Sequence, residues 1–365
     1  MKIKDIINVL ESLAPPSLQE SYDNAGLITG NAQEECTGVI CSLDVTETIL
    51  EEAIRKKCNL IVAHHPIIFR GIKRLTGKNN TERAIITSIK HDIAIYAIHT
   101  NLDNVLNGVN GKIADRLGLI DQQILLSKEG ILKKLYTFVP HSHAEAVRAA
   151  IWQAGGGNIG NYSECSFNAE GTGTFKGNDT TTPFVGKPGE LHYEKEIKVE
   201  VIFPAWLQSQ IIAALQTAHP YEEVAFDIIQ LSNNYQAAGS GITGLLPEPV
   251  EETAFLTLLK NAFHLPVIRH TGLRGKMIKK VAICGGAGSF LIPNALASKS
   301  DIYITSDIKY HEFFEADNKI LMADIGHFES EQFTIDLLHD ILREKFPTFA
   351  VLKTEVNTNP VFYYV

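Results

Sequence analysis

Histidine and carboxylate residues follow three apolar segments that lie far apart in the chain, at residues 60–63, 93–98 and 320–323. Each segment has the length and composition of a buried β-strand. Because ligands of open α/β sheets collect at the carboxyl ends of strands, these side chains can meet in one crevice. Imidazoles and carboxylates without thiolates are a typical donor set for a metal ion. The candidate metal ligands are His64, His65, Asp103, His327 and Glu331.

The local spacing of these residues favours convergence. Side chains alternate between the two faces of a strand, so His64 and His65 can share one pocket only if the strand ends there. Pro66 helps to end it, because proline lacks an N–H for the sheet and keeps the preceding residue extended. His327 and Glu331 are four residues apart at the start of a helical pattern, and they therefore share one helix face.

The number of candidate ligands favours two metal ions. A catalytic zinc ion typically takes about three protein ligands and keeps one position for water, whereas this set offers five. If Glu331 bridges, each ion takes about three protein ligands, and the ions lie ~3.5–4 Å apart. The nitrogen and oxygen donors suit zinc, manganese or iron. We expect two divalent metal ions per chain, with zinc preferred.

Composition and charge restrict the class of protein. The chain has 365 residues, of which 45% are hydrophobic and 21% charged, and this length suffices for two or three domains. A net charge of −9 argues against broad nucleic-acid binding, which needs a basic face. No apolar stretch approaches the ~20 residues of a membrane-spanning helix. Residues 1–13 resemble an amphipathic helix more than a signal peptide, and the five cysteines show no paired spacing. We expect a cytoplasmic protein without a membrane anchor.

Strand and helix patterns alternate at both ends of the chain, but the middle differs. Residues 38–119 and 279–356 show the βαβ order of a mainly parallel sheet, whereas the part between them is rich in Gly, Thr, Asn and Ser. Within it, residues 138–140 align with residues 202–204 in a weak repeat, and two βαβ repeats make a ferredoxin-like unit. We predict an α/β fold: a discontinuous αβ domain with a mainly parallel central sheet, residues 1–125 and 246–365, interrupted by a ferredoxin-like α+β insert, residues 126–245.

Other polar positions near the strand ends are open to two interpretations. His99 is a candidate catalytic acid or a residue that orients a metal ligand. The basic residues between 70 and 83 hold substrate phosphates or form a solvated loop or oligomer contact. The glycine-rich run 285–289 presents backbone N–H groups to a phosphate or permits a tight turn. Asp307, His311 and Asp324 are candidates for supporting the metal ligands or facing the substrate.

The ligand segments resemble the signature motifs of the GTP cyclohydrolase I type 2 family, also called NGG-interacting-factor-three-like. The resemblance rests on residues 64–66, 99–103 and 326–331, together with residues 23–27. The insert resembles the PII-like or CutA-like domain of the longer bacterial members, most clearly at residues 219–224. The resemblance implies a toroidal homohexamer whose inserts cap the ring, and a dinuclear site held by His64, His65, Asp103, His327 and Glu331.

The resemblance also implies hydrolytic opening of the guanine imidazole ring of GTP. An activated water would attack the carbon between the two ring nitrogens while a nearby acid protonates the departing nitrogen. We therefore expect a small-molecule substrate, GTP or another nucleotide or heterocycle. The alternative functions are a non-catalytic metal-binding ring whose insert senses a ligand, and a metallophosphatase served by the basic run.

Overall fold

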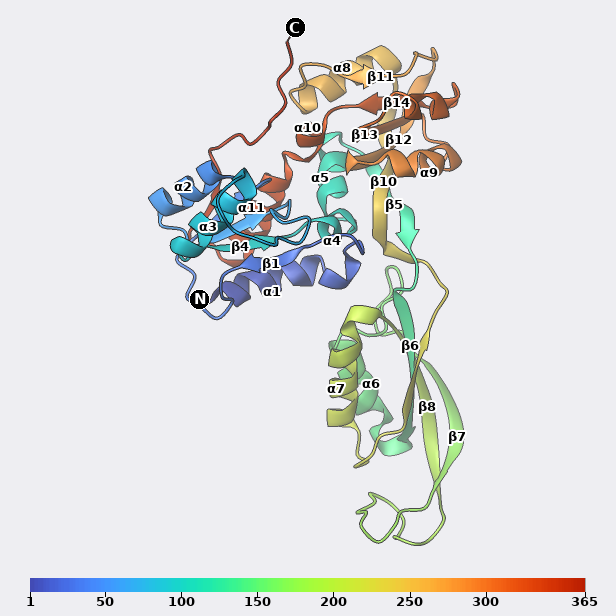
Figure 1. The fold of residues 1–365 in the computed structure, drawn as a ribbon. Helices are drawn as coiled ribbons and strands as arrows, with labels where there is room; N and C mark the ends of the chain where they lie inside the picture. Colours follow the sequence, from blue (N-terminus) through green and yellow to red (C-terminus); the bar gives the residue numbers. More distant parts are fainter. Residues whose placement is uncertain (365) are drawn as a thin grey trace. The chain divides into compact units, whose positions relative to one another are not determined.

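The computed structural model describes residues 1–364 and divides the chain into two compact units (Figure 1). Unit 1 combines residues 1–127 with the chain from residue 236 onward, and unit 2 comprises Lys128–Tyr235. From the sequence we placed the second boundary at residues 245/246. The structure places residues 236–245 in unit 1, because strand β10 (Tyr235–Glu251) pairs with another strand of that unit from Ile242 onward.

The first sheet of unit 1 has the strand order β1-β4-β3-β2-β15. Four of these strands, β4, β3, β2 and β15, run parallel, and β1 is antiparallel to β4. Strands β2, β3 and β4 are buried at every position, which explains why they read as continuous apolar runs. The bounds are β1 Gly26–Thr29, β2 Val39–Ser42, β3 Leu60–Ala63, β4 Ala94–Ala97 and β15 Val351–Lys353.

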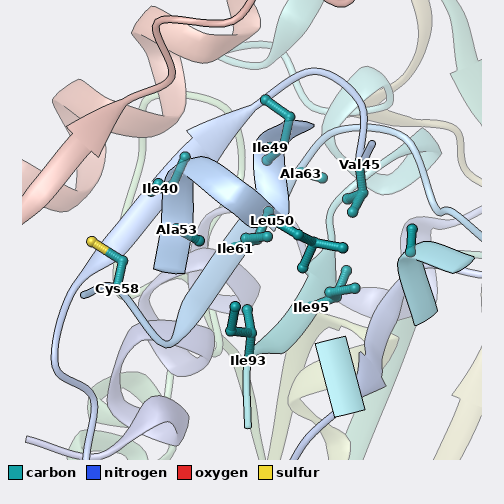
Figure 2. Close-up of a cluster of buried hydrophobic side chains, with 11 residues drawn as sticks. Ile40, Val45, Ile49, Leu50, Ala53, Cys58, Ile61, Ala63, Ile93 and Ile95 are labelled. Carbon is teal, nitrogen blue, oxygen red and sulfur yellow. The ribbon is translucent and has the colours of Figure 1, made fainter. Parts of the chain in front are cut away.

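Helices bury the apolar side chains of this sheet. Ile49, Leu50 and Ala53 of helix α2 pack with Ile40 and Ile95 of the strands in one core cluster (Figure 2). The apolar residues of α2 recur at the spacing of one helix face, and its N-terminus is capped by the Thr46 hydroxyl. The helices of this half are α1 Ile3–Leu13, α2 Glu47–Lys56, α3 Asn80–Lys90, α4 Thr100–Asp103, α5 Val109–Arg116 and α11 Thr334–Lys345.

A second sheet in unit 1 has the strand order β11-β14-β13-β12-β10-β5. Strands β12, β13 and β14 are parallel, whereas β11 and β10 pair antiparallel with β14 and β12. The single central sheet that we predicted is therefore wrong. The amino-terminal and carboxy-terminal βαβ runs each form their own sheet. Among the described residues, β15 crosses to the first sheet, and β5 of the amino-terminal segment joins the second. The bounds are β5 Ile120–Lys128, β11 Arg269–His270, β12 Met277–Ala287, β13 Ile302–Ser306 and β14 Leu321–Asp324, with helices α8 Glu252–Ala262, α9 Ile292–Ala297 and α10 His327–Glu331.

Unit 2 is an α+β unit with one antiparallel sheet of order β7-β8-β6-β9. Its elements follow the order β-α-β-β-α-β. Helices α6 and α7 cover one face of the sheet, where Val147 and Leu215 pack with Val139, Val199 and Val201. The bounds are β6 Leu132–Pro140, α6 Ala144–Gln153, β7 Phe167–Phe175, β8 His192–Pro204, α7 Gln208–Ala218 and β9 Phe226–Gln230.

Among residues 1–364, no helix has the length and hydrophobicity that crossing a bilayer requires.

Candidate metal centre

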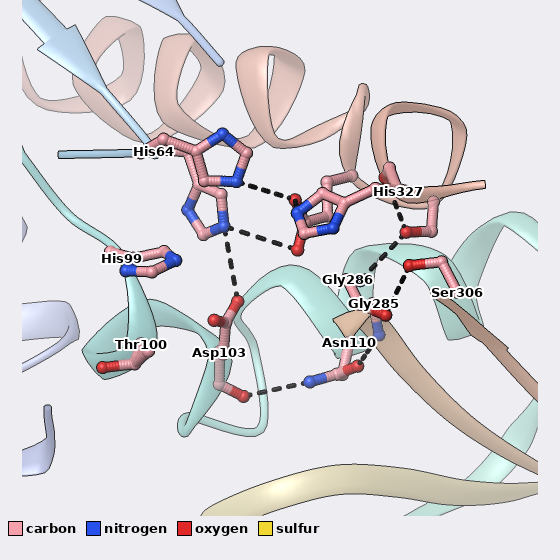
Figure 3. A network of polar contacts seen from close by, with 12 residues as sticks. His64, His99, Thr100, Asp103, Asn110, Gly285, Gly286, Ser306 and His327 are labelled. Atoms are coloured by element: carbon pink, nitrogen blue, oxygen red, sulfur yellow. Dashed lines mark hydrogen bonds and ion pairs between the residues drawn. The ribbon is translucent and has the colours of Figure 1, made fainter. Parts of the chain in front are cut away.

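The five predicted ligand side chains come together around Glu331 in unit 1 (Figure 3). The Glu331 side chain is only 3% exposed. Its Oε2 lies 3.0 Å from His65 Nε2 and 3.1 Å from His327 Nε2, and its Oε1 lies 3.8 Å from His64 Nε2. Asp103 Oδ1 completes the cluster at 3.6 Å from His64 Nε2. Ligand atoms from distant parts of the chain therefore surround one buried carboxylate.

The ends of three strands position these residues. His64 and His65 follow β3 directly, and Asp103 ends the short helix α4 after β4. His327 and Glu331 are the first and last residues of α10, which follows β14. Gly326 joins β14 to α10 with a φ of 88°, a conformation that glycine adopts without strain. The residues follow strand ends, as their position after apolar runs predicted, but these strands belong to both sheets of unit 1 and not to the single sheet that we expected.

Each imidazole of the cluster is oriented by a hydrogen bond on its outer nitrogen. His64 Nδ1 donates to the Ile98 carbonyl oxygen at 2.9 Å. His65 Nδ1 and His327 Nδ1 lie 2.8 and 2.7 Å from carboxylate oxygens of Asp44 and Asp307. Donation from Nδ1 fixes the tautomer in which Nε2 carries a lone pair. Once the rings are neutral, all three Nε2 atoms present that lone pair to the interior of the cluster, as metal ligation requires.

Two atoms of the cluster have no hydrogen-bond partner. His64 Nε2 and Asp103 Oδ1 are both buried and unsatisfied. Buried polar atoms in folded proteins nearly always have a partner, and an orphaned pair therefore needs an explanation such as a bound ion. The ligand atoms form three overlapping groups, each within 4.8 Å: His64, Asp103 and Glu331; His65, His327 and Glu331; and His64, His65 and His99. The donor set and its unsatisfied atoms fit a metal site.

Without a metal ion, protons on the imidazoles and on Asp103 balance the negative charge of the carboxylates in this cluster. Burial opposes protonation of His65, but the neighbouring Asp44 and Glu331 carboxylates raise its pKa to about 10. Glu331 and Asp307 likewise raise the pKa of His327 to about 9 against the effect of burial. Burial and the charge of Glu331 raise the pKa of Asp103 to about 7. A divalent cation would replace these protons, so metal binding should release protons and weaken at low pH.

His99 lies beside the cluster. Its ring centroid is 5.2 Å from that of His64 and 5.4 Å from that of His65. Its Nδ1 lies 2.8 Å from Asp23 Oδ1. Burial raises the pKa of Asp23, but hydrogen bonds from His99 and Thr100 lower it to about 2, so the carboxylate stays ionised. His99 is thus held with Nε2 toward the cluster, a position that suits a catalytic acid or a residue that orients a metal ligand.

The other predicted residues divide into two that support the site and one that does not. Asp307 holds His327, as described above. Asp324 is 5% exposed and accepts hydrogen bonds from the backbone N–H groups of Ile308 and Gly326 and from Arg269, so it shapes the turn into α10. His311 is exposed and packs on Tyr310 instead of facing the cavity. The left-handed backbone at Asp307, with φ 55°, turns the chain away before His311.

The glycine-rich run 285–289 begins as the irregular end of strand β12 and does not present its first N–H groups to a ligand. Gly285 N–H donates to Asn110 Oδ1 at 2.8 Å, and Gly286 N–H donates to Ser330 Oγ at 2.9 Å. A Cβ atom on Gly286 would lie 2.3 Å from Glu331 Oε1. This glycine is therefore required for space beside the central carboxylate, a role that the sequence did not reveal.

Sequence reasoning also missed Asp44, the partner of His65. Asp44 follows the buried strand β2 closely, so the rule that selected His64 and Asp103 could have found it. Of the two interpretations of the basic residues between 70 and 83, the position of these residues does not support phosphate binding beside the cluster, because none of them lines the cavity there. Arg83 instead pairs with Glu47 at 2.8 Å.

A cavity of about 750 Å³ opens onto the cluster. This volume is in the range of small-molecule sites. Its walls contain Arg269 and several aromatic rings, which suit a flat ring with polar substituents. The aromatic residues of the wall are Tyr22, Phe69, Phe290, Phe328 and Tyr363.

Comparisons with known proteins identify the family of this chain. The family model described as Duf34/NIF3 (NGG1p interacting factor 3) matches residues 1–360. The chain belongs to the NIF3 family. A NIF3 relative from Halalkalibacterium halodurans, named GTP cyclohydrolase 1 type 2 homolog, is 39% identical over 97% of each chain. A Bacillus subtilis relative of the same name is 36% identical and covers 98% of this chain and 97% of its own. The crystal structure of a Bacillus cereus protein related to NIF3 matches with a TM-score of 0.87 and 36% identity over 100% of this chain and 99% of its own.

Replacing Asp44 with alanine should weaken zinc binding by about 10–100-fold, because His65 loses the acceptor that fixes its tautomer and raises its basicity. Competition with a chromophoric chelator would measure this affinity. The matched control is Asp340→Ala, which removes a carboxylate from a surface pair with Lys112. Equal zinc affinities for the two variants would contradict the orienting role of Asp44.

Proposed function

We propose that this protein is a hydrolase that binds two divalent metal ions, with zinc preferred over manganese and iron. The observation that carries the proposal is the buried pair His64 Nε2 and Asp103 Oδ1, which lack partners beside the central Glu331 carboxylate. His64 and Asp103 would hold one ion, and His65 and His327 the other. Glu331 has one oxygen nearer each group and would bridge them.

The metal pair would supply an activated water and polarise the substrate. The chain's own residues would orient the substrate and donate a proton. The aromatic walls and Arg269 would orient a flat heterocycle over the cluster. His99, held at Nδ1 by the ionised Asp23, would keep a proton at Nε2 for a departing nitrogen. These roles support hydrolytic ring opening more than phosphate release, since the basic run lies outside the cavity.

GTP is the substrate to test first, because the curated relatives are named GTP cyclohydrolase 1 type 2 homolog. We further propose that the chain assembles into a toroidal homohexamer and that unit 2 is a PII-like or CutA-like insert. The β-α-β-β-α-β order of unit 2 supports the second of these proposals.

The test is incubation of zinc-saturated protein with GTP, followed by assay of formate, inorganic phosphate and ring-opened nucleotide. The proposal expects formate and the ring-opened product, both lost when the protein is stripped of metal. A His99→Gln variant should retain zinc but release formate more slowly if His99 donates the proton. Release of phosphate alone would instead indicate a metallophosphatase. No turnover of GTP or of a heterocycle panel would indicate a non-catalytic metal-binding ring.

A further inference from the structure

Unit 2 contains a second cavity, of about 790 Å³, which the metal chemistry does not use. It lies on the face of the sheet opposite α6 and α7. Phe138 and Glu196 line it, whereas their chain neighbours Val139 and Ile197 point into the core with the helices. The loop between β7 and β8 closes one side, and the segment 219–224 contributes Tyr221. Residues 219–224 are the part of the insert that most clearly resembles the PII-like or CutA-like domain.

Glu196 is a buried carboxylate without a cationic partner. It is 7% exposed, and its Oε1 accepts a hydrogen bond from the Tyr221 hydroxyl at 2.8 Å. No Lys, Arg or His of residues 1–364 lies within ion-pair distance of it. Its neighbours on the same face of β8 are paired: Glu194 lies 2.9 Å from His192, and Glu200 lies 2.8 Å from Lys198. An unpaired buried charge is costly, so this one is a candidate to receive a ligand's charge.

Two glycines on the neighbouring strand make room for this carboxylate. Gly171 and Gly173 of β7 stand opposite Glu196 and Glu194 in the register of the sheet. A Cβ atom on Gly173 would lie 2.1 Å from Glu196 Oε2, whereas one on Gly171 would meet nothing within 4 Å. The absence of side chains at Gly171 and Gly173 therefore lets the Glu196 carboxylate lie across β7 and leaves open space beside it.

Aromatic rings surround the carboxylate. The centroids of Phe175 and Phe184 lie 6.1 and 6.2 Å from that of Tyr221. His219 fixes Tyr221, because its Nδ1 accepts the Tyr221 N–H at 3.1 Å while its Nε2 donates to the Phe138 carbonyl at 3.0 Å. Burial lowers the pKa of His219, which is consistent with a neutral ring. His219 thus positions an aromatic wall and does not neutralise Glu196.

The covering loop is held by a second carboxylate. Thr182 N–H donates to both oxygens of Glu222, at 3.0 and 3.2 Å, and so ties the Phe184 loop to the segment 219–224.

Carboxylates outnumber ammonium groups among the residues that line the cavity, and Lys198 is already paired with Glu200. The charged lining residues are Glu170, Glu196, Glu222, Glu223, Lys176 and Lys198.

We propose that this cavity binds a small organic cation, with its substituted ammonium group against Glu196 and the rings of Phe175, Phe184 and Tyr221. Aromatic faces attract such cations through their quadrupole, and desolvation strengthens the attraction. The buried carboxylate supplies the countercharge. The cavity volume lies in the range of sites that bury a whole small molecule.

Choline and its neutral isostere 3,3-dimethylbutan-1-ol test the charge requirement on the full chain by saturation-transfer NMR titration. The proposal expects binding of choline and at least about tenfold weaker binding of the neutral alcohol. Glu196→Gln should weaken choline binding by a similar factor. Glu145→Gln, which removes a charge from the exposed surface of α6 on the other face of the sheet, should leave it unchanged.

Thermal unfolding without ligand separates a binding role from a structural one. Glutamine can still accept the Tyr221 hydrogen bond, so relief of an unpaired buried charge should keep or raise the melting temperature of Glu196→Gln. The proposal is overturned if choline does not bind, if both probes bind equally, or if Glu196→Gln binds choline like the parent chain. A lowered melting temperature with unchanged choline binding would assign Glu196 to structure alone.

Discussion

Replacing Glu331 with glutamine is expected to lower the bound metal from the proposed two ions per chain toward one or none. Glu331 is the only side chain with oxygens toward both His64 and the pair His65 and His327 in the described residues. The neutral amide keeps the shape of the side chain but cannot supply the anionic oxygens that a bridge needs. Elemental analysis of the folded, zinc-equilibrated protein would give the number of ions per chain.

The matched control for Glu331→Gln is Glu344→Gln, which makes the same chemical change on the exposed surface of α11. It should retain the full metal content. Circular dichroism would establish that both variants are folded, since removal of a buried anion leaves the protonated imidazoles without their partner. Unchanged metal content in folded Glu331→Gln would remove Glu331 from the bridge and with it the dinuclear proposal.

Replacing Gly286 with alanine is expected to lower zinc affinity by about tenfold or more, because the new methyl group displaces the carboxylate that the imidazoles face. A Cβ atom there would lie 2.3 Å from Glu331 Oε1. Gly286 also has a φ of 64°, where a non-glycine residue costs about 1–2 kcal/mol. Zinc titration followed by chelator competition would measure the change.

Gly275→Ala separates the two effects of that substitution. Gly275 has a similar φ of 69°, but a Cβ atom on it would meet nothing within 4 Å. The two variants should therefore lose similar stability from the backbone, whereas only Gly286→Ala should lose zinc affinity. An equal loss of affinity in both would show that general destabilisation, and not contact with Glu331, weakens the site.

The strand ends that carry the candidate ligands could be predicted because the signal is local. Strands β2, β3 and β4 are buried on both faces and therefore read as short apolar runs, and the first polar residues after them are at the sheet edge. The same rule would have selected Asp44. The rule that polar residues after a buried strand face the site failed for His311. The backbone at Asp307 is left-handed, and the residue types did not indicate this conformation.

The sequence by itself determined which residues can bind metal, since imidazole and carboxylate chemistry and the end of an apolar run are properties of short segments. Only the tertiary structure decided that two sheets, not one, bring those segments together. Strand pairing joins residues as distant as Val39 and Val351, and nothing local specifies such partners. The tertiary structure likewise decided that Glu331 lies at the centre, because it meets His64 and His65 from the other end of the chain. It also decided that Gly286 of β12 leaves room for the carboxylate, because this depends on how β12 packs against α10.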